Sequence, residues 1–156
     1  MNASMKRVTE GVGDSMEKDG HLIEEAVRRL IQGTCCLVGE EKECVWDLFH
    51  KTREALLDHI EFEAQWIFPR LDDVDLEKHQ AEHRALLEKL EEARYEFETS
   101  DGNRFRRRFE EFASLFANHH AGSSDRVSGL RIREEEVAAD QNLRRIRKRV
   151  EHGFVE

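Results

Sequence analysis

The sequence predicts an all-α protein, an up-down-up-down four-helix bundle with an additional C-terminal helix. Charged residues make up 38% of the 156 residues and there is one proline, and long stretches rich in Glu, Lys, Leu, Arg and Ala favour helices over strands. Apolar side chains recur at helical spacing in five segments. The links between the first four segments are short, which favours antiparallel neighbours.

The first two predicted helices each carry one apolar side. The first runs from about Met16 to Ile31, and a region with Gly33 and Gly39 ends it. The second runs from about Glu43 to Phe68, and Pro69 ends it because proline lacks the N–H donor and clashes with the preceding turn. The apolar side of the first helix is formed by Leu22, Ile23, Ala26, Val27, Leu30 and Ile31.

The third and fourth predicted helices are separated by a cluster of turn-forming residues. The third runs from about Leu76 to Phe97, the turn covers residues 100–103, and the fourth runs from about Arg104 to His120. The expected core face of the third helix is Leu76, Leu86, Leu90, Ala93 and Phe97. The fourth helix has an aromatic stripe of Phe105, Phe109, Phe112 and Phe116.

A charged segment, Arg131–Glu151, follows the bundle and reads as a fifth helix with few apolar positions. Its apolar side chains are sufficient for it to pack either on the bundle or on a partner, and the sequence leaves both open. We therefore expect a flexible N-terminus over residues 1–15, the four-helix bundle over residues 16–128, and a charged helix or tail over residues 129–156.

Charge and composition exclude several kinds of partner. The formal net charge of −9 argues against nucleic acid, since phosphate binding needs a basic face. No apolar run approaches the roughly 20 residues of a membrane span, and residues 1–18 lack the apolar core of a secretory signal. We expect a cytoplasmic protein, with Cys35, Cys36 and Cys44 as free thiols.

Two pairs of metal-binding residue types stand four apart on neighbouring helices. His59 and Glu63 lie on the second helix, and His79 and His83 lie on the third. Residues at this spacing are about 40° apart around the axis and about 6 Å apart along it. Each pair therefore points in one direction, and in both helices that direction is the apolar side.

Inward polar groups of this kind need a partner. A buried Glu without one costs several kcal/mol or stays neutral, and buried imidazoles also need hydrogen-bond partners. A metal cation satisfies both, because it binds neutral imidazole and ionised carboxylate. The four side chains at positions 59, 63, 79 and 83 thus predict a metal site inside the bundle.

Three further histidines are candidates for this site. His119 and His120 lie about 50° to either side of the Phe stripe of the fourth helix, so both can face inward. His21 lies nearly opposite the apolar stripe of the first helix, and only a distorted turn after Gly20 would bring it in.

The segment 59–69 (HIEFEAQWIFP) resembles the hemerythrin-like, or HHE cation-binding, family, in which a His, a Glu four later and a closing Phe-Pro form one ligand helix. The segment 79–83 (HQAEH) is similar to the two ligands of the next helix, and the resemblance covers residues 16–128. It implies a non-haem iron protein with two irons, bridged by Glu63 and bound terminally by His59, His79, His83 and His119.

Two positions depart from the family pattern. The family's first helix reads Asp-His-x-Leu-Ile, whereas here the histidine comes one place later, at His21 after Asp19-Gly20. The family's last helix has a carboxylate four or five residues after its histidine. His119 has Ser123 and Ser124 there, and His120 has Asp125. His119, or alternatively His120 with Asp125, can therefore complete the site, and one metal ion, zinc, or an incomplete iron pair remains an alternative to two irons.

The resemblance implies reversible binding of O2 or NO for carriage, storage or sensing, and we expect a binding protein rather than an enzyme. Phe62, Trp66, Phe112 and Phe116 are expected to line a dry pocket. Two alternatives remain: an iron-dependent oxidoreductase acting on peroxide, O2 or NO, and a regulatory bundle with a vestigial or zinc site. In the last case Arg131–Glu151 would form a homodimer or bind a protein partner.

Overall fold

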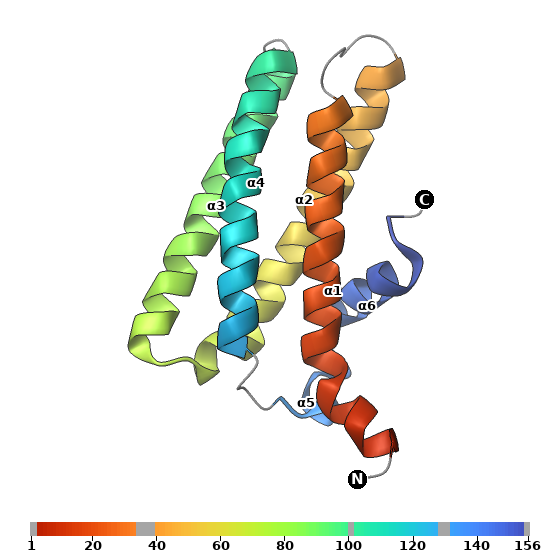
Figure 1. The fold of residues 1–156 in the computed structure, drawn as a ribbon, viewed down its shortest axis with the longest axis vertical. Helices are drawn as coiled ribbons and strands as arrows, with labels where there is room; N and C mark the ends of the chain where they lie inside the picture. The colour runs from red at the N-terminus through yellow and green to blue at the C-terminus, as the bar shows by residue number, and fades with distance from the viewer. Residues whose placement is uncertain (1–2, 34–39, 100–101, 128–131, 155–156) are drawn as a thin grey trace.

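The computed structural model describes residues 3–33, 40–99, 102–127 and 132–154, and in these ranges it contains helices and no strand. The four long helices extend along the long axis of the molecule (Figure 1). They are α1 (Ala3–Gly33), α2 (Glu40–Phe62), α3 (Asp73–Thr99) and α4 (Gly102–Val127). The prediction of an all-α helical bundle is confirmed.

Apolar stripes from the four long helices form the main core. The four phenylalanines at positions 105, 109, 112 and 116 are all buried, as their helical spacing predicted. Phe49 of α2 contacts two of these rings, with centroids 5.7 Å from Phe105 and 5.6 Å from Phe109. Each fully buried ring of this size contributes roughly 1.5–3 kcal/mol relative to exposure, so this cluster fixes how the helices sit around the site.

Two helices extend beyond the bounds that periodicity predicted. Helix α1 begins at Ala3 rather than Met16, and its early apolar residues Val12 and Met16 pack on the C-terminal segment. Helix α4 continues to Val127, past Gly122. A mid-helix glycine costs only about 1 kcal/mol, and the buried Ser123 beside it indicates that packing outweighs this cost. The flexibility of residues 1–15 stays a prediction.

The second predicted helix changes its winding before the proline instead of running uniformly to Phe68. Helix α2 ends at Phe62 and is followed by a π-helical turn, Glu63–Ile67, and a 3₁₀ turn, Phe68–Arg70. Pro69 lies in the first turn of that 3₁₀ segment, where its missing N–H leaves no bond broken. The wider π turn begins at Glu63 and therefore changes the helical geometry at the predicted site residue.

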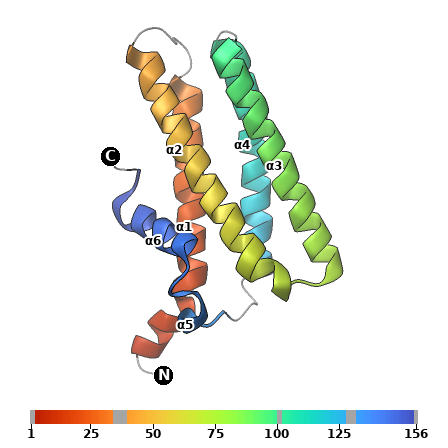
Figure 2. The same ribbon diagram turned by 180° about the vertical axis from the view of Figure 1, so that it is seen from behind.

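The C-terminal segment forms two helices rather than one. They are α5 (Glu134–Val137) and α6 (Gln141–His152), and the carboxylate of Asp140 caps α6 by accepting from the Leu143 N–H at 2.9 Å. Val137, Leu143 and Ile146 are buried in a second apolar cluster with α1 and Phe62. Of the two placements left open by the sequence, the structure has α6 on the bundle, against α1 and α2 (Figure 2).

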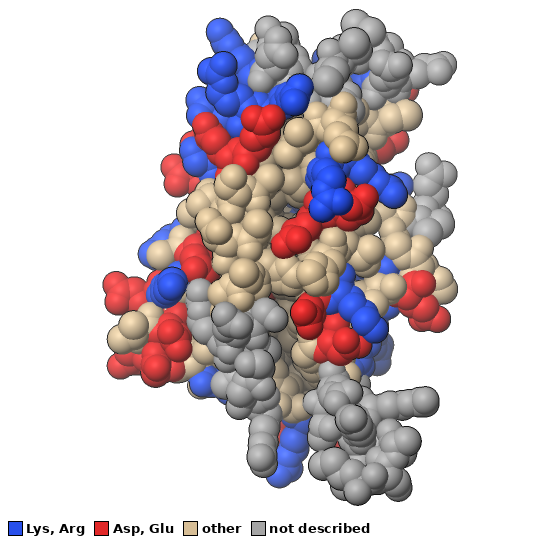
Figure 3. Space-filling view, viewed as in Figure 1, with Lys and Arg blue, Asp and Glu red and all other residues tan. Residues whose placement is uncertain are grey.

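The surface carries both signs of charge. On the face shown in Figure 3, acidic and basic side chains are interspersed among the residues that the structure describes. No helix within the described ranges has the length and apolar character needed to cross a bilayer. Cys44 is an exposed free thiol, whereas Cys35 and Cys36 lie outside the described residues.

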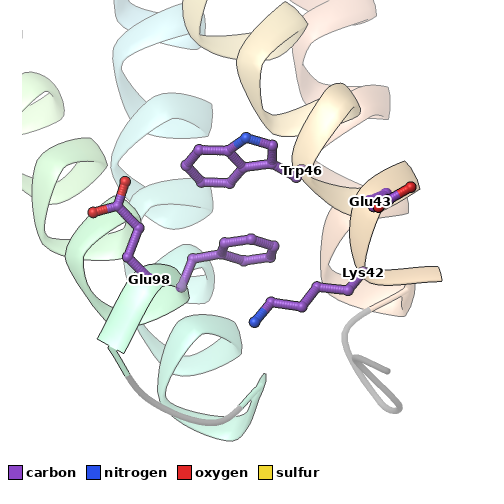
Figure 4. Close-up of a pocket in the computed structure, with 5 residues that line it drawn as sticks. Lys42, Glu43, Trp46 and Glu98 are labelled. Carbon is purple, nitrogen blue, oxygen red and sulfur yellow. The ribbon is translucent and has the colours of Figure 1, made fainter. Parts of the chain in front are cut away.

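A surface pocket of about 300 Å³ opens between the start of α2 and the end of α3 (Figure 4). Lys42 lies over the ring of Phe97, 5.6 Å from its centroid, and Trp46 stacks on the same ring. The pocket lining is Lys42, Glu43, Trp46, Phe97 and Glu98. The lining contains none of the predicted site residues.

Candidate metal centre

The predicted site residues of α2 and α3 are all buried. Glu63, the first residue of the π turn, is 1% exposed, and His59 lies one turn before it. His79 and His83 lie near the start of α3 and are buried too. The end of α2, the start of α3 and the end of α4 meet at one end of the bundle (Figures 1 and 2).

The Glu63 carboxylate is the centre of this cluster, and its two oxygens have different neighbours. Oε1 lies 2.8 Å from Nε2 of His59. Oε2 lies 2.8 Å from Nε2 of His83 and 3.9 Å from Nε2 of His79. The structure therefore brings all four residues singled out by helix phase to one point, with one imidazole on the Oε1 side and two on the Oε2 side.

His119 of α4 is a third imidazole on the Oε2 side. Its Nε2 lies 3.3 Å from Oε2 of Glu63 but makes no hydrogen bond, although the atom is fully buried. Its Nδ1 lies 2.6 Å from a Glu82 carboxylate oxygen. A metal-binding histidine characteristically has this arrangement, with one nitrogen held by a carboxylate and the other left for the ion.

The three imidazoles on the Oε2 side lie close to one another. The ring centroids of His83 and His119 are 4.9 Å apart, and those of His79 and His119 are 5.3 Å apart. The Phe68 ring lies 5.0 Å from that of His83 and covers the cluster from the helix end. Glu63, His83 and His119 each place a donor atom within 4.8 Å of the others, as do His79, Glu82 and His119.

The Oε1 side is satisfied by protein groups instead. Nδ1 of His59 lies 3.2 Å from Oδ2 of Asp19, a fully buried carboxylate on α1. Asp19 accepts two hydrogen bonds from the Arg149 guanidinium of α6, at 2.8 and 3.0 Å. His59 is therefore held at both ring nitrogens, by Asp19 and by Glu63.

These contacts make the metal-free centre a set of paired charges. Burial opposes ionisation of Glu63, but the surrounding imidazoles, His59 foremost, hold its pKa well below the usual range. Burial likewise opposes the charged form of His59, but Glu63 and Asp19 raise its pKa to about 9. For His119, Glu63 and Glu82 outweigh burial and raise the pKa. Without a cation, the neighbouring carboxylates therefore favour the protonated forms of His59 and His119.

The other two candidate histidines lie in a different cluster, on the seam between α1 and α4. The His21 side chain is 64% exposed, with Nδ1 3.8 Å from a Glu24 oxygen. Nδ1 of His120 lies 2.8 Å from the other oxygen of Glu24. His21, Glu24 and His120 form a donor group of their own. The side chain of Asp125, the proposed companion of His120, lies outside what the structure describes.

Gly20 explains where the His120 ring goes. A Cβ on Gly20 would stand 2.3 Å from Nε2 of His120, so the ring occupies the space that a side chain at position 20 would fill. That Nε2 is buried and has no hydrogen-bond partner. Gly20 stands where the family pattern has its first-helix histidine. In this chain the His120 ring, from α4, occupies the space beside it.

Sequence reasoning missed the groups that hold the imidazoles. Asp19 and Glu82 bind His59 and His119 across helices, and a contact of this kind has no fixed spacing in the sequence. Of the expected pocket aromatics, Phe62, Phe112 and Phe116 are buried, but Trp66 is turned toward α6, and its indole N–H donates to Asp140 at 3.0 Å. Phe68, which the sequence marks only as part of the closing Phe-Pro pair, is the ring that contacts His79 and His83.

The donor set fits a transition-metal cation. Imidazole nitrogens suit zinc, iron, copper and nickel, and a carboxylate adds the negative charge that favours a divalent or trivalent ion. The buried, unpartnered Nε2 of His119, aimed at Glu63, is the observation that an ion would explain.

Comparison with curated proteins and with solved structures gives no significant match. The family model described as the hemerythrin HHE cation binding domain matches residues 5–126. This range includes the histidines and carboxylates around Glu63 and ends before α6, the helix that carries Arg149. That span holds Glu63 and the buried histidines of α2, α3 and α4 in one continuous match. The chain therefore belongs to the hemerythrin HHE cation-binding family.

Proposed function

We propose that this protein binds one iron ion per chain with Glu63, His79, His83 and His119, and uses it to bind O2 or NO reversibly for carriage, storage or sensing. The observation that carries the proposal is the buried group of three imidazoles around one oxygen of Glu63, including an Nε2 atom with no hydrogen-bond partner. The proposal takes α1–α4 as an up-down-up-down bundle and the compartment as the cytoplasm.

The difference between the two oxygens of Glu63 supports one ion rather than two. On the Oε1 side the available imidazole is that of His59, which already bonds Asp19 and Glu63. Position 20 has no side chain to add. His120 bonds Glu24 through Nδ1, and its unpartnered Nε2 lies against Gly20, in a donor group with His21 and Glu24 and not with Glu63. A second ion would have to take His59 from Glu63 and find its remaining ligands elsewhere. In the two-iron alternative, His59 is a ligand and Glu63 a bridge.

The residues of the chain have separate tasks in this proposal. Glu82 fixes the His119 ring with Nε2 toward the ion, and His59 holds the Glu63 carboxylate by its other oxygen. Phe68 covers the imidazoles of α3 and excludes water from them. A ferrous ion held by three neutral imidazoles and one carboxylate would supply an open coordination position for a diatomic ligand.

The test is to load the protein with ferrous iron without oxygen, count the iron, and then admit air or NO. We expect about one iron per chain and new near-ultraviolet and visible absorption bands, which disappear when the gas is removed. The His79→Ala/His83→Ala variant should bind no iron and give no bands. Protein that retains no iron, or stays colourless after loading, contradicts the proposal.

The same experiment separates the alternatives. Turnover of peroxide, O2 or NO by the loaded protein would make it an oxidoreductase instead of a carrier or sensor. Protein that takes up zinc but no iron would be a regulatory bundle with a zinc site. In that case α6, whose outer residues Arg144 and Lys148 are exposed, is the surface to test for a second copy or a protein partner.

A further inference from the structure

We propose that Arg149 of the C-terminal helix is a positioning residue for the metal centre, acting through Asp19 and His59 on the Glu63 carboxylate. The proposal rests on the proposed metal-binding function, and it assigns to α6 a task beyond covering the bundle. Helix α6 lies outside residues 5–126, the part of the chain that matches the family, so this would be a component that the chain adds to the domain.

The contacts form a continuous chain from α6 to the centre. The Arg149 guanidinium donates to both oxygens of Asp19, at 2.8 and 3.0 Å. Oδ2 of Asp19 lies 3.2 Å from Nδ1 of His59, and Nε2 of His59 lies 2.8 Å from Oε1 of Glu63. Four side chains, from α6, α1, α2 and the π turn after α2, therefore connect α6 with the carboxylate that would face the ion.

Asp19 can hold His59 only if its own charge is compensated. It is 0% exposed, and an isolated carboxylate at such a position costs several kcal/mol or becomes protonated. Arg149 supplies a planar pair of N–H donors that matches both carboxylate oxygens. Without this partner, Asp19 would lose either its charge or its orientation, and His59 would lose the group that fixes its ring.

Arg149 is itself firmly held. Its third nitrogen, Nη1, lies 3.1 Å from an Asp58 oxygen, and Asp58 also binds Arg145 at 2.9 Å. The buried Leu143 and Ile146 anchor α6 in the apolar cluster beside Phe62. The guanidinium is therefore presented by a docked helix, which gives it the fixed geometry that a positioning role requires.

A purely structural role for Arg149 is the competing interpretation, and Arg145 provides the matched control. Both arginines lie on α6 and both pair with Asp58, but Arg149 also reaches Asp19. Replacing either one weakens the attachment of α6 to α2. A change that occurs with Arg149→Met and is absent with Arg145→Met therefore follows from the contacts that Arg149 alone makes, which are the paired bonds to Asp19 and a longer bond, 3.4 Å, to the Ala55 carbonyl.

The first measurement uses full-length protein loaded with Co2+, whose visible absorption reports the ligand geometry. We expect Arg149→Met to alter the absorption and to speed Co2+ loss to a chelator by about tenfold, the lower end for groups that support metal ligands. Arg145→Met should leave the spectrum unchanged and the rate within about twofold. Arg149→Lys keeps the charge but loses the paired donors, so its rate of Co2+ loss should lie between those of the two methionine variants. Equal rates for Arg149→Met and Arg145→Met would overturn the proposal.

The second measurement uses metal-free protein and keeps the proposal separate from the proposed function. The Nδ1 proton of His59, buried against Asp19, should give a resolved downfield proton resonance in wild type and in Arg145→Met. It should broaden or vanish in Arg149→Met, with Arg149→Lys as the second variant if the methionine variant fails to fold. An unchanged resonance in Arg149→Met contradicts positioning. Wild-type protein that takes up no Co2+ contradicts the proposed function, and this resonance still decides the role of Arg149.

Discussion

The buried polar groups beside the two oxygens of Glu63 are satisfied in different ways. On the Oε2 side three imidazoles gather, and one buried nitrogen of His119 has no hydrogen-bond partner. On the Oε1 side His59 is bonded at both nitrogens, and the charge is balanced by Asp19 and Arg149. The first arrangement is incomplete without a cation, whereas the second is complete as a protein network. The ligand pattern in the sequence can therefore fold into a site whose two sides differ.

The largest expected effect on metal binding comes from removing imidazoles from one side of Glu63 or from the other. His79→Ala/His83→Ala removes two donors from the Oε2 side and should weaken metal binding by at least about 100-fold, since even supporting residues reach that value. His59→Ala should keep one ion per chain, with weaker binding because Glu63 loses its Oε1 contact. Metal analysis after dialysis measures both, with the exposed His50→Ala as control. If His59→Ala abolishes binding as completely as the double variant, the two sides are equivalent and the comparison fails.

Glu82 should have the next largest effect, because it holds the His119 ring. Glu82→Gln keeps an acceptor for the Nδ1 proton but removes the negative charge, and we expect metal affinity to fall by about 10-fold to 100-fold. Glu88→Gln, on an exposed part of α3, is the matched control and should have no effect. Competition with a chromophoric chelator gives both affinities. Equal affinities for Glu82→Gln and wild type would show that the 2.6 Å contact of Glu82 with His119 does not support the ligand.

Proton release on metal binding distinguishes one ion from two. Ligand histidines must be neutral, and Glu63 and Glu82 raise the pKa of His119 despite its burial. His59, with a pKa raised to about 9, keeps its proton if it remains between Asp19 and Glu63. Calorimetry at pH 7.5 in two buffers should therefore detect protons released from His119 on metal binding, and His59→Gln should release the same number as wild type. A smaller release from His59→Gln than from wild type would mean that His59 gives up its proton and becomes a ligand.

The same pKa values set the pH dependence of the metal-free protein. A raised folded-state pKa means that charged His59 contributes stability fully below its unfolded value, about 6.5. That contribution is lost as pH rises through about 9. Metal-free protein should therefore become less stable to urea between pH 7 and 9.5, and His59→Gln should reduce this slope, leaving the part that comes from His119. Metal affinity should change in the opposite direction and fall as pH drops, because protons compete for His119.

The core of the site could be read from the sequence because helix phase is local. His59 with Glu63 and His79 with His83 share faces by spacing alone, and helix phase allowed both His119 and His120 to face inward. Helix phase also placed His21 away from the apolar side, where the structure has it exposed. These conclusions need only the helix period and the apolar stripe.

The supporting groups could not be read from the sequence because they depend on packing between distant segments. Arg149 contacts Asp19 from 130 residues further along the chain, and nothing in its own helix indicates that it points at a buried carboxylate. The placement of α6 depends on three apolar residues, which the sequence alone allowed to face a partner instead. The sequence shows that Gly20 replaces the histidine of the family pattern, but it does not show that the His120 ring occupies the space at position 20.

Gly20→Ala has the smallest expected effect on metal binding. It tests whether the His120 cluster is separate from the site around Glu63. The new Cβ would stand 2.3 Å from Nε2 of His120, so the ring must move and lose its contact with Glu24, at a cost of about 1–2 kcal/mol. Gly13→Ala has no neighbour within 4 Å and should stabilise the same helix by roughly 0.5–1 kcal/mol. In His120→Ala the space is free, so adding Gly20→Ala there should cost less than it does alone. Urea unfolding measures the stability of all four variants.

Metal content should stay at the wild-type value in all four variants, because the His120 cluster is separate from Glu63. Loss of the ion in Gly20→Ala would mean that the two clusters act as one site.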